Sequence, residues 1–366
     1  MPQHPVARSQ PVPTRLATAD SDPCAVPLRD HLWLRTPSMV VTGVVGFSGD
    51  VSPARLLQFI ENKIFAIERF TQKLTPRLGH LQRWARDPHL DAQHHLKVVH
   101  LNYSSSIQKI IDRVCDTPLD MSHPPWQITL VQRDRDTPVA IFRIHHVIAD
   151  GRGLMEAMLR SADDPQAWPR TKAAWRAQLA GRAAALQPGR VQQLLTPLHF
   201  LGGLVLAMVH LARRPIDAPP RCLAGPLGPS QTYRMPPTSF RLQELRELAE
   251  HLGGGSINDV LLLIVTGALR RYTEACNEEP RPMRCLQPVR LPPTAADGIG
   301  NGVSVGSCRL PLHLSDRRQM LAALRQQMAP LKKGSAEVAG NAWLASLLGL
   351  LPAAYTRSVF RRVTRQ

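Results

Sequence analysis

The feature that most constrains the fold of this chain is the stretch IFRIHHVIADGRGLMEAMLR, which begins at Ile141. Its first residues are apolar and β-branched, as in a strand, and Asp150-Gly151 then supplies a turn. Beyond the turn, apolar residues recur at the spacing of one helical face. The stretch therefore predicts a strand, a tight turn and a helix in immediate succession, with two histidines at the end of the strand.

Successive side chains of a strand point to opposite faces, so the two histidines point in opposite directions. His146 continues the face of Phe142, which we expect to be interior, and His145 continues the face of Arg143. An imidazole can take a proton from a bound hydroxyl or amine as that group attacks an acyl carbonyl. A G-x-S-x-G pattern occurs at residues 302–306, but it lies inside a predicted strand and not at the strand-to-helix turn of a nucleophile elbow, and no cysteine is in a nucleophile setting,. Direct acyl transfer with a lone histidine base therefore fits better than a covalent enzyme intermediate.

A structural role for the histidines is the competing interpretation. A strand-end histidine is by itself more often structural than catalytic, and His94-His95 form a second pair without a following Asp-Gly. The pattern H-H-x-x-x-D-G, fixed at four of its seven positions, is more specific than a histidine pair. We expect Asp150 to hold local structure, for instance by pairing with an arginine such as Arg152.

The rest of the chain mixes strands with helices in two halves, which predicts an α/β or α+β fold in two lobes. Ser52 is expected to cap a helix, and Ser256 with Asp259 forms an S-x-x-D signature that opens a very apolar, buried helix,. Glycines 253–255 should end the helix before it. The predicted strands are 39–47, 94–103, 126–133, 139–147, 284–291 and 301–314,. The predicted helices are 52–70, 105–120, 241–252, 256–276 and 315–328, together with one after Gly151 whose apolar stripe runs from Leu154 to Leu159,.

Composition shifts along the chain predict four segments. Residues 1–27 are a Pro-rich, disordered tail, and 28–165 are the N-terminal lobe with the histidine motif,. Residues 166–237 are a linker that holds the apolar run LLTPLHFLGGLVLAMVHLA, which we interpret as an interfacial or buried helix rather than a spanning one,. Residues 238–366 are the C-terminal lobe.

The charge balance is strongly basic, with 45 Lys+Arg against 28 Asp+Glu, a net charge of +17. This balance fits anionic partners such as phosphates, CoA or acidic lipid headgroups, although a GC-biased genome explains it equally well. Aromatic residues make up only 5% and no nucleic-acid-binding signature occurs, so we expect no nucleic acid partner,. The six cysteines lack metal-ligand spacing, so we expect reduced thiols of a cytosolic protein and no metal site,.

Four motifs carry a resemblance. HHVIADG matches the signature of the CoA-dependent acyltransferase superfamily, and the flanking sequence resembles the bacterial wax ester synthase/diacylglycerol acyltransferase family. PLDMSHPPWQITLV is similar to that family's PLD-x-x-x-P-L-W-E stretch, and HLDAQHHLKVVHL is similar to a segment that places a histidine, here His95, in an early strand. SINDVLLLIVTGALRRY and GNGVSVGSCRLPL are similar to its N-D helix and its G-N-x-x-S strand.

The resemblance implies a two-lobed acyltransferase fold of mixed sheets flanked by helices, with an active-site tunnel between the lobes. His146 would be the general base that deprotonates diacylglycerol or a fatty alcohol. The acyl group would come from acyl-CoA as substrate, without a further cofactor, and the product would be triacylglycerol or wax ester. His145 would be supportive, and Asp150 with Gly151 mainly structural.

The resemblance also implies substrate-binding positions. Asn258, Trp126 and Ser304 are the candidates; for Trp126 a core position is the stronger alternative, and Asn258 divides between a polar contact near the reacting centre and the first turn of a helix,. The sequence departs from the family at Pro125, where Leu is usual. It also shows no N-x-P-G-P-type stretch after the last apolar helix, so we expect a truncated C-terminal lobe.

Three functions are thus open from sequence. The leading one is the O-acyltransferase, peripherally bound in the cytoplasm to the inner face of the plasma membrane or to lipid droplets, as basic residues beside apolar runs suggest. The second is an acyltransferase of the same superfamily with a different acceptor. The third is a catalytically weak acyl-CoA- or lipid-binding protein.

Overall fold

The computed structural model describes residues 25–35, 39–77, 79, 81–101, 106–133, 137–174, 219–224, 240–291, 299–332 and 336–351. Residues 1–24 of the predicted tail, the apolar run of the linker and the last residues lie outside these ranges, so the predictions for them stay predictions. Two residues assigned to the tail are ordered: Ala25 pairs with Arg83, and Val26 lies in the core. No helix among the described residues is long and apolar enough to cross a membrane.

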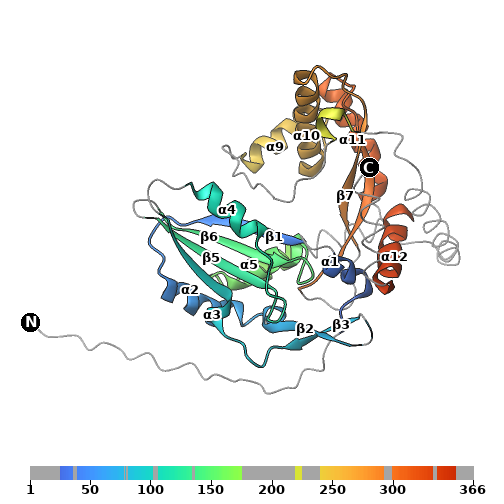
Figure 1. Ribbon diagram of the computed structural model, residues 1–366. Coiled ribbons are helices and arrows are strands. Elements are labelled where there is room, and N and C mark those ends of the chain that lie inside the picture. The colour runs from blue at the N-terminus through green and yellow to red at the C-terminus, as the bar shows by residue number, and fades with distance from the viewer. Residues whose placement is uncertain are drawn as a thin grey trace, which may run out of the picture.

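The first half of the chain is built on a mixed four-stranded sheet in the order β1-β6-β5-β4 (Figure 1). β4 and β5 run parallel and are joined through a helix, whereas β6 is antiparallel to both of its neighbours. The strands are β1 (Val40–Gly46), β4 (Leu96–Leu101), β5 (Trp126–Arg133) and β6 (Val139–His145). A separate hairpin joins β2 (Gln72–Pro76) to β3 (Gln82–Arg86).

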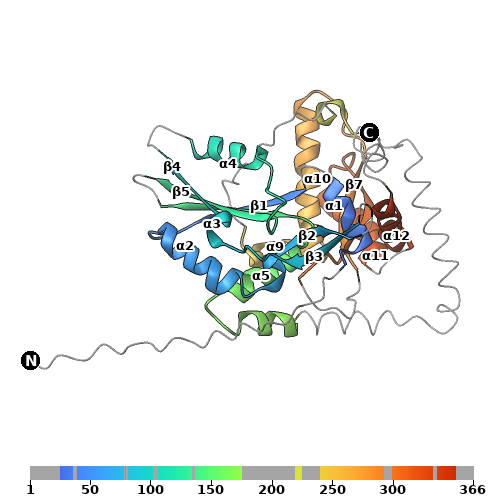
Figure 2. The same cartoon turned by 60° about the horizontal axis from the view of Figure 1, so that its bottom comes forward.

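Helices cover both faces of this sheet (Figure 2). On one face lies α4 (Ile107–Asp116), which buries Ile111 against Leu101, Val131 and Ile141. The other face meets α2 (Pro53–Phe59), the π-helical turn η2 (Ile60–Ile64), the 3₁₀ turn η3 (Glu68–Thr71) and α5 (Gly151–Ser161). The face that carries Phe142 is interior, as predicted, but the face of Arg143 and His145 is buried as well. A sheet that is packed on both sides places β6 in the middle of the lobe.

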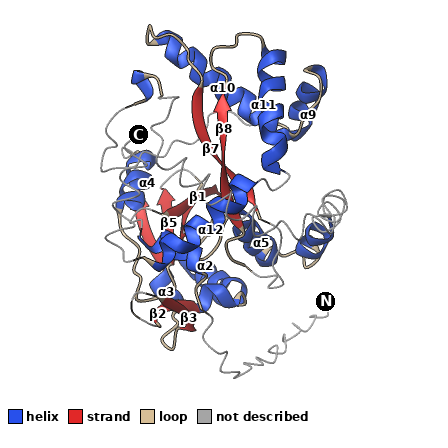
Figure 3. Cartoon of the chain, turned by 90° about the vertical axis from the view of Figure 1, so that its right-hand side faces the viewer, coloured by secondary structure: helices blue, strands red, loops and turns tan. Residues whose placement is uncertain are grey.

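The second half holds a helical body and a long hairpin (Figure 3). Its elements are η4 (Arg221–Leu223), α9 (Leu242–His251), α10 (Ile257–Ala275), β7 (Met283–Arg290), β8 (Val303–Leu310), α11 (Arg317–Lys332) and α12 (Ala336–Leu350). α11 packs its buried leucines and methionines against β8 and α10. The hairpin extends from this helical body toward the first sheet, so the two lobes meet near the last residues of β7 and the first of β8.

Most local predictions are confirmed at their caps. Ser52 accepts a hydrogen bond from the backbone N–H of Arg55, and Ser256 with Asp259 forms the expected reciprocal capping box. The three glycines after α9 all have positive φ, which only glycine adopts without strain,. Each of these features depends on residues a few positions apart, which is why the sequence predicts them.

Three predictions are wrong in detail. His94 and His95 lie in the short helix α3 (Ala92–His95), not in a strand, because Asp91 caps it through the backbone N–H of Gln93. The helix predicted to reach residue 70 ends its α-form at Phe59 and continues as π and 3₁₀ turns. α10 is buried along one side only, since Leu261 and Val265 are 43% and 49% exposed.

Residues 25–35 connect distant parts of the fold. They form the 3₁₀ turn η1 (Leu28–Asp30) and the helix α1 (His31–Arg35), which lie beside α12 in Figures 1 and 2. The guanidinium of Arg35 donates to the carbonyl oxygens of Leu348 and Gly349 at 2.8 and 2.7 Å. A side chain at position 349 would meet the carbonyl of Leu28, so only glycine permits this contact. The segment and α12 therefore form one packed unit.

Candidate active site

The two histidines of the motif lie where β6 ends, between its neighbouring strands β1 and β5. His145 is the last residue of β6, and its backbone N–H donates to the carbonyl of Pro125 at 2.9 Å. The backbone N–H of His146 donates to the carbonyl of Met39, just before β1, at 2.8 Å. These two hydrogen bonds fix the backbone of both histidines. The backbone at the end of β6 in turn sets the direction of each imidazole.

His145 is buried, with 6% of its surface exposed. Its Nδ1 accepts the backbone N–H of Val147 at 3.2 Å, so the ring proton is on Nε2,. Burial, and to a lesser extent the neighbouring His146, lowers the pKa of His145 to about 4,. His145 is therefore a neutral imidazole near pH 7 and a structural neighbour of His146.

His146 is half-buried and has an aromatic neighbour. The indole of Trp33, from α1, stacks on its imidazole with ring centroids 4.2 Å apart. Its Nδ1 is buried and has no hydrogen-bond partner within the described part of the chain. Nε2 is therefore the nitrogen left to exchange a proton with a bound molecule.

Asp150 connects the motif to the second lobe. One carboxylate oxygen accepts the backbone N–H groups of Arg152 and Gly153, which caps α5. The other oxygen accepts the backbone N–H of Gly302 at 2.8 Å. Asp150 thus holds local structure, as predicted, and the hydrogen bonds that its carboxylate accepts in the described part of the chain come from backbone N–H groups. The carboxylate joins the start of α5 to the chain that leads into β8.

Asn301 makes a second connection at the same place. Its Nδ2 donates to the carbonyl of His146 at 2.9 Å and, at 3.4 Å, to that of Val147. The carbonyl of Asn301 accepts from the guanidinium of Arg29 at 2.6 Å. In the sequence, Asn301 stands out only as part of a motif. Trp33 was not predicted as a site residue, although an isolated tryptophan at the start of the ordered sequence was a usable signal.

The three residues predicted to bind substrate lie in different surroundings. Trp126 is in the core, where Nε1 donates to the carbonyl of Phe70 and the ring stacks on His95 at 3.9 Å. Ser304 is buried in β8 and donates to the carbonyl of Val338 at 2.7 Å. Asn258 is exposed in the first turn of α10. Substrate contact by these residues stays a prediction.

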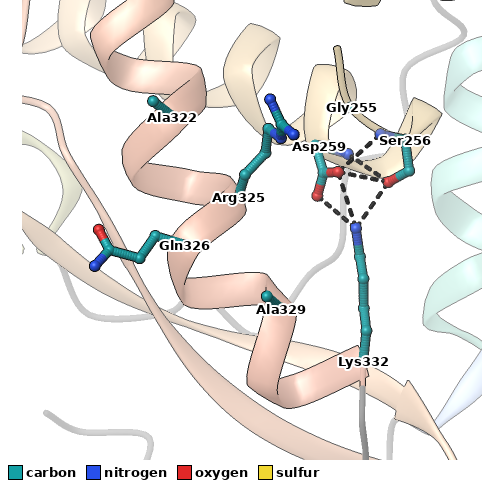
Figure 4. Close-up of a pocket in the computed structure, with 8 residues that line it drawn as sticks. All are labelled: Gly255, Ser256, Asp259, Ala322, Arg325, Gln326, Ala329 and Lys332. Atoms are coloured by element: carbon teal, nitrogen blue, oxygen red, sulfur yellow. Dashed lines mark hydrogen bonds and ion pairs between the residues drawn. The ribbon is translucent and has the colours of Figure 1, made fainter. Parts of the chain in front are cut away.

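A pocket of about 600 Å³ lies beside that first turn (Figure 4). Lys332 reaches from the end of α11 to the carboxylate of Asp259 at 2.7 Å and to the hydroxyl of Ser256 at 2.8 Å. The pocket is also lined by Gly255, Ala322, Arg325, Gln326 and Ala329. None of these residues belongs to the histidine motif. No group of three or more described His, Cys, Asp or Glu side chains is arranged to hold a metal ion.

The chain resembles the same family of known proteins in its sequence and in its fold. Residues 47–261 match the family model described as the wax ester synthase/diacylglycerol acyltransferase catalytic domain. A protein of Mycobacterium tuberculosis (strain ATCC 25618 / H37Rv), provisionally named a diacylglycerol O-acyltransferase, is 28% identical over 287 residues, 74% of this chain. The chain spans 63% of the length of that relative.

Solved structures show the same fold at lower identity. The wax ester synthase/diacylglycerol acyltransferase from Marinobacter aquaeolei VT8 superposes with a TM-score of 0.52 at 20% identity, covering 90% of this chain and 78% of that one. A starter condensation domain of rhizomide synthetase, solved with C8-CoA, superposes with a TM-score of 0.51 at 16% identity, covering 87% and 73%. The fold is therefore the two-lobed CoA-dependent acyltransferase fold.

Proposed function

Because the chain belongs to the wax ester synthase/diacylglycerol acyltransferase family, we propose that it transfers a long-chain acyl group from acyl-CoA to diacylglycerol or a fatty alcohol. The products are triacylglycerol or wax ester, together with free CoA. The observation that carries the proposal is the state of His146: the family's motif histidine is half-buried, stacked on Trp33, and has only Nε2 left to meet a substrate.

The proposed chemistry needs one base and no covalent enzyme intermediate. Nε2 of His146 takes the proton of the acceptor hydroxyl as its oxygen attacks the thioester carbonyl. The tetrahedral intermediate then collapses, the carbon–sulfur bond breaks, and the proton passes to the departing CoA sulfur. A neutral His145 supports this step, since a second positive charge beside His146 would make its protonation less favourable,.

The acceptor and the location follow from the chemistry of the substrates. Long-chain alcohols and diacylglycerol reside in membranes and lipid droplets, and the net charge of +17 favours a surface with anionic headgroups,. We therefore place the protein at the cytoplasmic face of such a surface as a peripheral protein. Asn258, Ser304 and Trp126 remain candidates for contact with the acyl chain or its acceptor.

The test is acyl transfer by the purified chain from radiolabelled palmitoyl-CoA, with dioleoylglycerol and hexadecanol offered in parallel. His146→Ala is expected to abolish product, and His145→Ala to reduce it in part. His100→Ala is the matched control, because His100 is exposed on β4 and away from the motif. All variants are checked by circular dichroism, so that loss of fold is distinguished from loss of chemistry.

The outcomes separate the alternatives. Product with one acceptor identifies the reaction, whereas product only with an amine or a carrier-bound hydroxyl assigns the chain to a different acceptor class. A folded chain that binds palmitoyl-CoA but forms no product with any acceptor contradicts the proposal and leaves a binding protein. Equal activity of His146→Ala and His100→Ala would remove His146 as the base.

A further inference from the structure

One side of α12 is apolar and exposed to solvent. Trp343 is 53% exposed, Leu347 is 43% exposed and Leu350 is 44% exposed. These residues follow one another at intervals of four and three positions, so they share one face of the helix. We call Trp343, Leu347 and Leu350 the apolar stripe of α12. An exposed apolar face of this kind marks an interaction site.

The opposite side of α12 is packed against the rest of the protein. Val338 is 1% exposed, and its carbonyl accepts the hydroxyl of Ser304 in β8 at 2.7 Å. Gly349 lies directly against the carbonyl of Leu28 in η1. Because these contacts fix the helix from one side, the apolar stripe is held in a set direction, away from β8 and η1.

The sequence that contains and follows the stripe is uncharged at first and then basic. After Glu337 it holds no Asp or Glu as far as residue 366. Within the same stretch it has four arginines: Arg357, Arg361, Arg362 and Arg365. Apolar side chains that include a tryptophan, followed by arginines without acids, are typical of proteins that lie on anionic bilayers.

The charge of the chain disfavours a second copy as the partner of the stripe. The net charge is +17, and two copies joined at α12 would bring their arginine-rich segments together,. An anionic bilayer attracts the same arginines and accepts the apolar side chains at the boundary between headgroups and acyl chains. Both the charge and the hydrophobicity of this surface therefore match a lipid surface better than a copy of the chain.

We propose that the apolar stripe of α12 is the surface through which the protein docks on an anionic lipid bilayer. This inference names the partner surface of the proposed function and rests on that proposal, in which the acceptor resides in a bilayer. Trp343, Leu347 and Leu350 enter the interfacial region, and the positive charge after the helix strengthens the attachment. Because Arg35 fixes α1 to α12, docking also brings the bilayer close to the segment that carries Trp33.

Vesicle binding by the purified full chain tests the proposal. Leu347→Glu places a negative charge in the middle of the stripe. Leu261→Glu is the matched control, because Leu261 is also 43% exposed but lies on α10. The probes are vesicles of phosphatidylcholine alone and of phosphatidylcholine mixed with phosphatidylglycerol. Co-sedimentation measures binding, light scattering measures the oligomeric state, and circular dichroism checks that each variant folds.

The wild type is expected to bind the anionic vesicles more tightly than the neutral ones, and high salt should weaken this binding. Leu347→Glu should bind at least about tenfold more weakly, because a carboxylate replaces a leucine that the bilayer buries. Leu261→Glu should bind as the wild type does. No binding by the wild type, or equal binding by the two glutamate variants, overturns the proposal. A wild-type dimer that Leu347→Glu converts to a monomer assigns the stripe to a second copy and overturns it too.

Tryptophan fluorescence gives a second readout, at the stripe itself. Anionic vesicles should shift the emission of the wild type to shorter wavelength, and brominated lipids should quench it. Trp343→Phe should still bind the vesicles but lose most of this shift, because phenylalanine keeps the apolar ring. A shift of the same size in Trp343→Phe overturns the proposal.

These measurements require no acyl transfer, so the two proposals fail separately. If the chain docks through the stripe but forms no product from palmitoyl-CoA, the proposed function fails and the docking surface stands. If product forms but Leu347→Glu binds vesicles as tightly as the wild type, the docking surface fails and the proposed function stands.

Discussion

The indole of Trp33 stacks on the imidazole of His146, with ring centroids 4.2 Å apart and planes inclined by 21°. The stacked pair joins α1, near the start of the described chain, to the residue that follows β6. Since α1 is in turn fixed to α12, the orientation of the proposed base depends on both ends of the described fold. The local geometry of the motif alone does not determine it.

Replacing Trp33 tests this dependence. Trp33→Ala is expected to lower kcat about threefold to tenfold, because an aromatic pair contributes about 0.5–1.5 kcal/mol beyond its buried area. Trp33→Phe, which keeps a stacked ring, should retain most of the activity. Trp168→Ala is the control, since the ring of Trp168 has the cationic side chains of Arg160 and Lys172 as neighbours. Wild-type kcat in Trp33→Ala would show that stacking does not position His146.

The low pKa of His145 predicts a loss of stability in acid. Its folded-state pKa of about 4 lies below the usual value of 6.5, so the unfolded chain binds the proton more readily between these two values,. The contribution of His145 is present above pH 6.5 and is lost as pH falls toward 4, by at most roughly 3 kcal/mol.

Urea denaturation across that range, with His145→Asn beside the wild type, measures this contribution. The asparagine keeps an acceptor for the backbone N–H of Val147 but cannot be protonated. The variant should lose less stability than the wild type between pH 6.5 and pH 4, and His100→Asn should behave as the wild type. Parallel pH curves for the wild type and His145→Asn would contradict a neutral, buried His145.

Asp150 is expected to act on stability through two separable contacts. Asp150→Ala loses the cap of α5 and the link to Gly302, which together should cost about 2–3 kcal/mol,. Asp150→Asn retains one acceptor oxygen for the cap and loses only the link, at about 1 kcal/mol. Ser52→Ala, at the cap of α2, should cost about 1 kcal/mol without changing kcat. Wild-type stability of Asp150→Asn would refute the contribution of the Gly302 link, and equal stability of the two Asp150 variants would refute that of the α5 cap.

Gly153 should tolerate no side chain. A Cβ at this position would lie 2.7 Å from Cβ of Ala149 and 3.0 Å from the carbonyl oxygen of Gly300, which is backbone of the second lobe. Gly153→Ala is therefore expected to destabilise the protein by about 1–3 kcal/mol and to lower kcat. Gly267→Ala, a helical glycine with open space around it, should be neutral or stabilising by up to about 1 kcal/mol,. Thermal unfolding of both variants measures these changes in stability.

The part of the fold that the sequence predicts is the part set by neighbouring residues. The strand, turn and helix around His146 follow from alternation, an Asp-Gly pair and a helical stripe. The cap at Ser256 follows from an aspartate three positions later. The same logic explains the error at His95, where a single capping aspartate outweighed the strand-forming run that begins one residue further on, at Leu96.

Contacts between residues far apart in the sequence could not be predicted from neighbouring residues. The asparagine that holds the carbonyl of His146 lies 155 residues away, and no periodicity connects the two positions. The half-exposed side of α10 was also unexpected, since apolar composition alone indicates burial but not which partner supplies it. The resemblance to a family placed Gly300 and Asn301 in a motif, yet only the fold brings that motif onto the turn after β6.

The hydrogen bonds from Arg35 to α12 also bear on how the site comes into being during synthesis. Their donor and acceptors are separated by 313 and 314 residues, among the longest loops that the chain has to close. A ribosome therefore releases Trp33 early and its supporting helix late, and contacts of such high sequence separation form slowly. Until α12 is synthesised, the nascent chain carries the histidine motif without the stacked tryptophan in place, and the proposed acyl-transfer site is completed only when α12 folds.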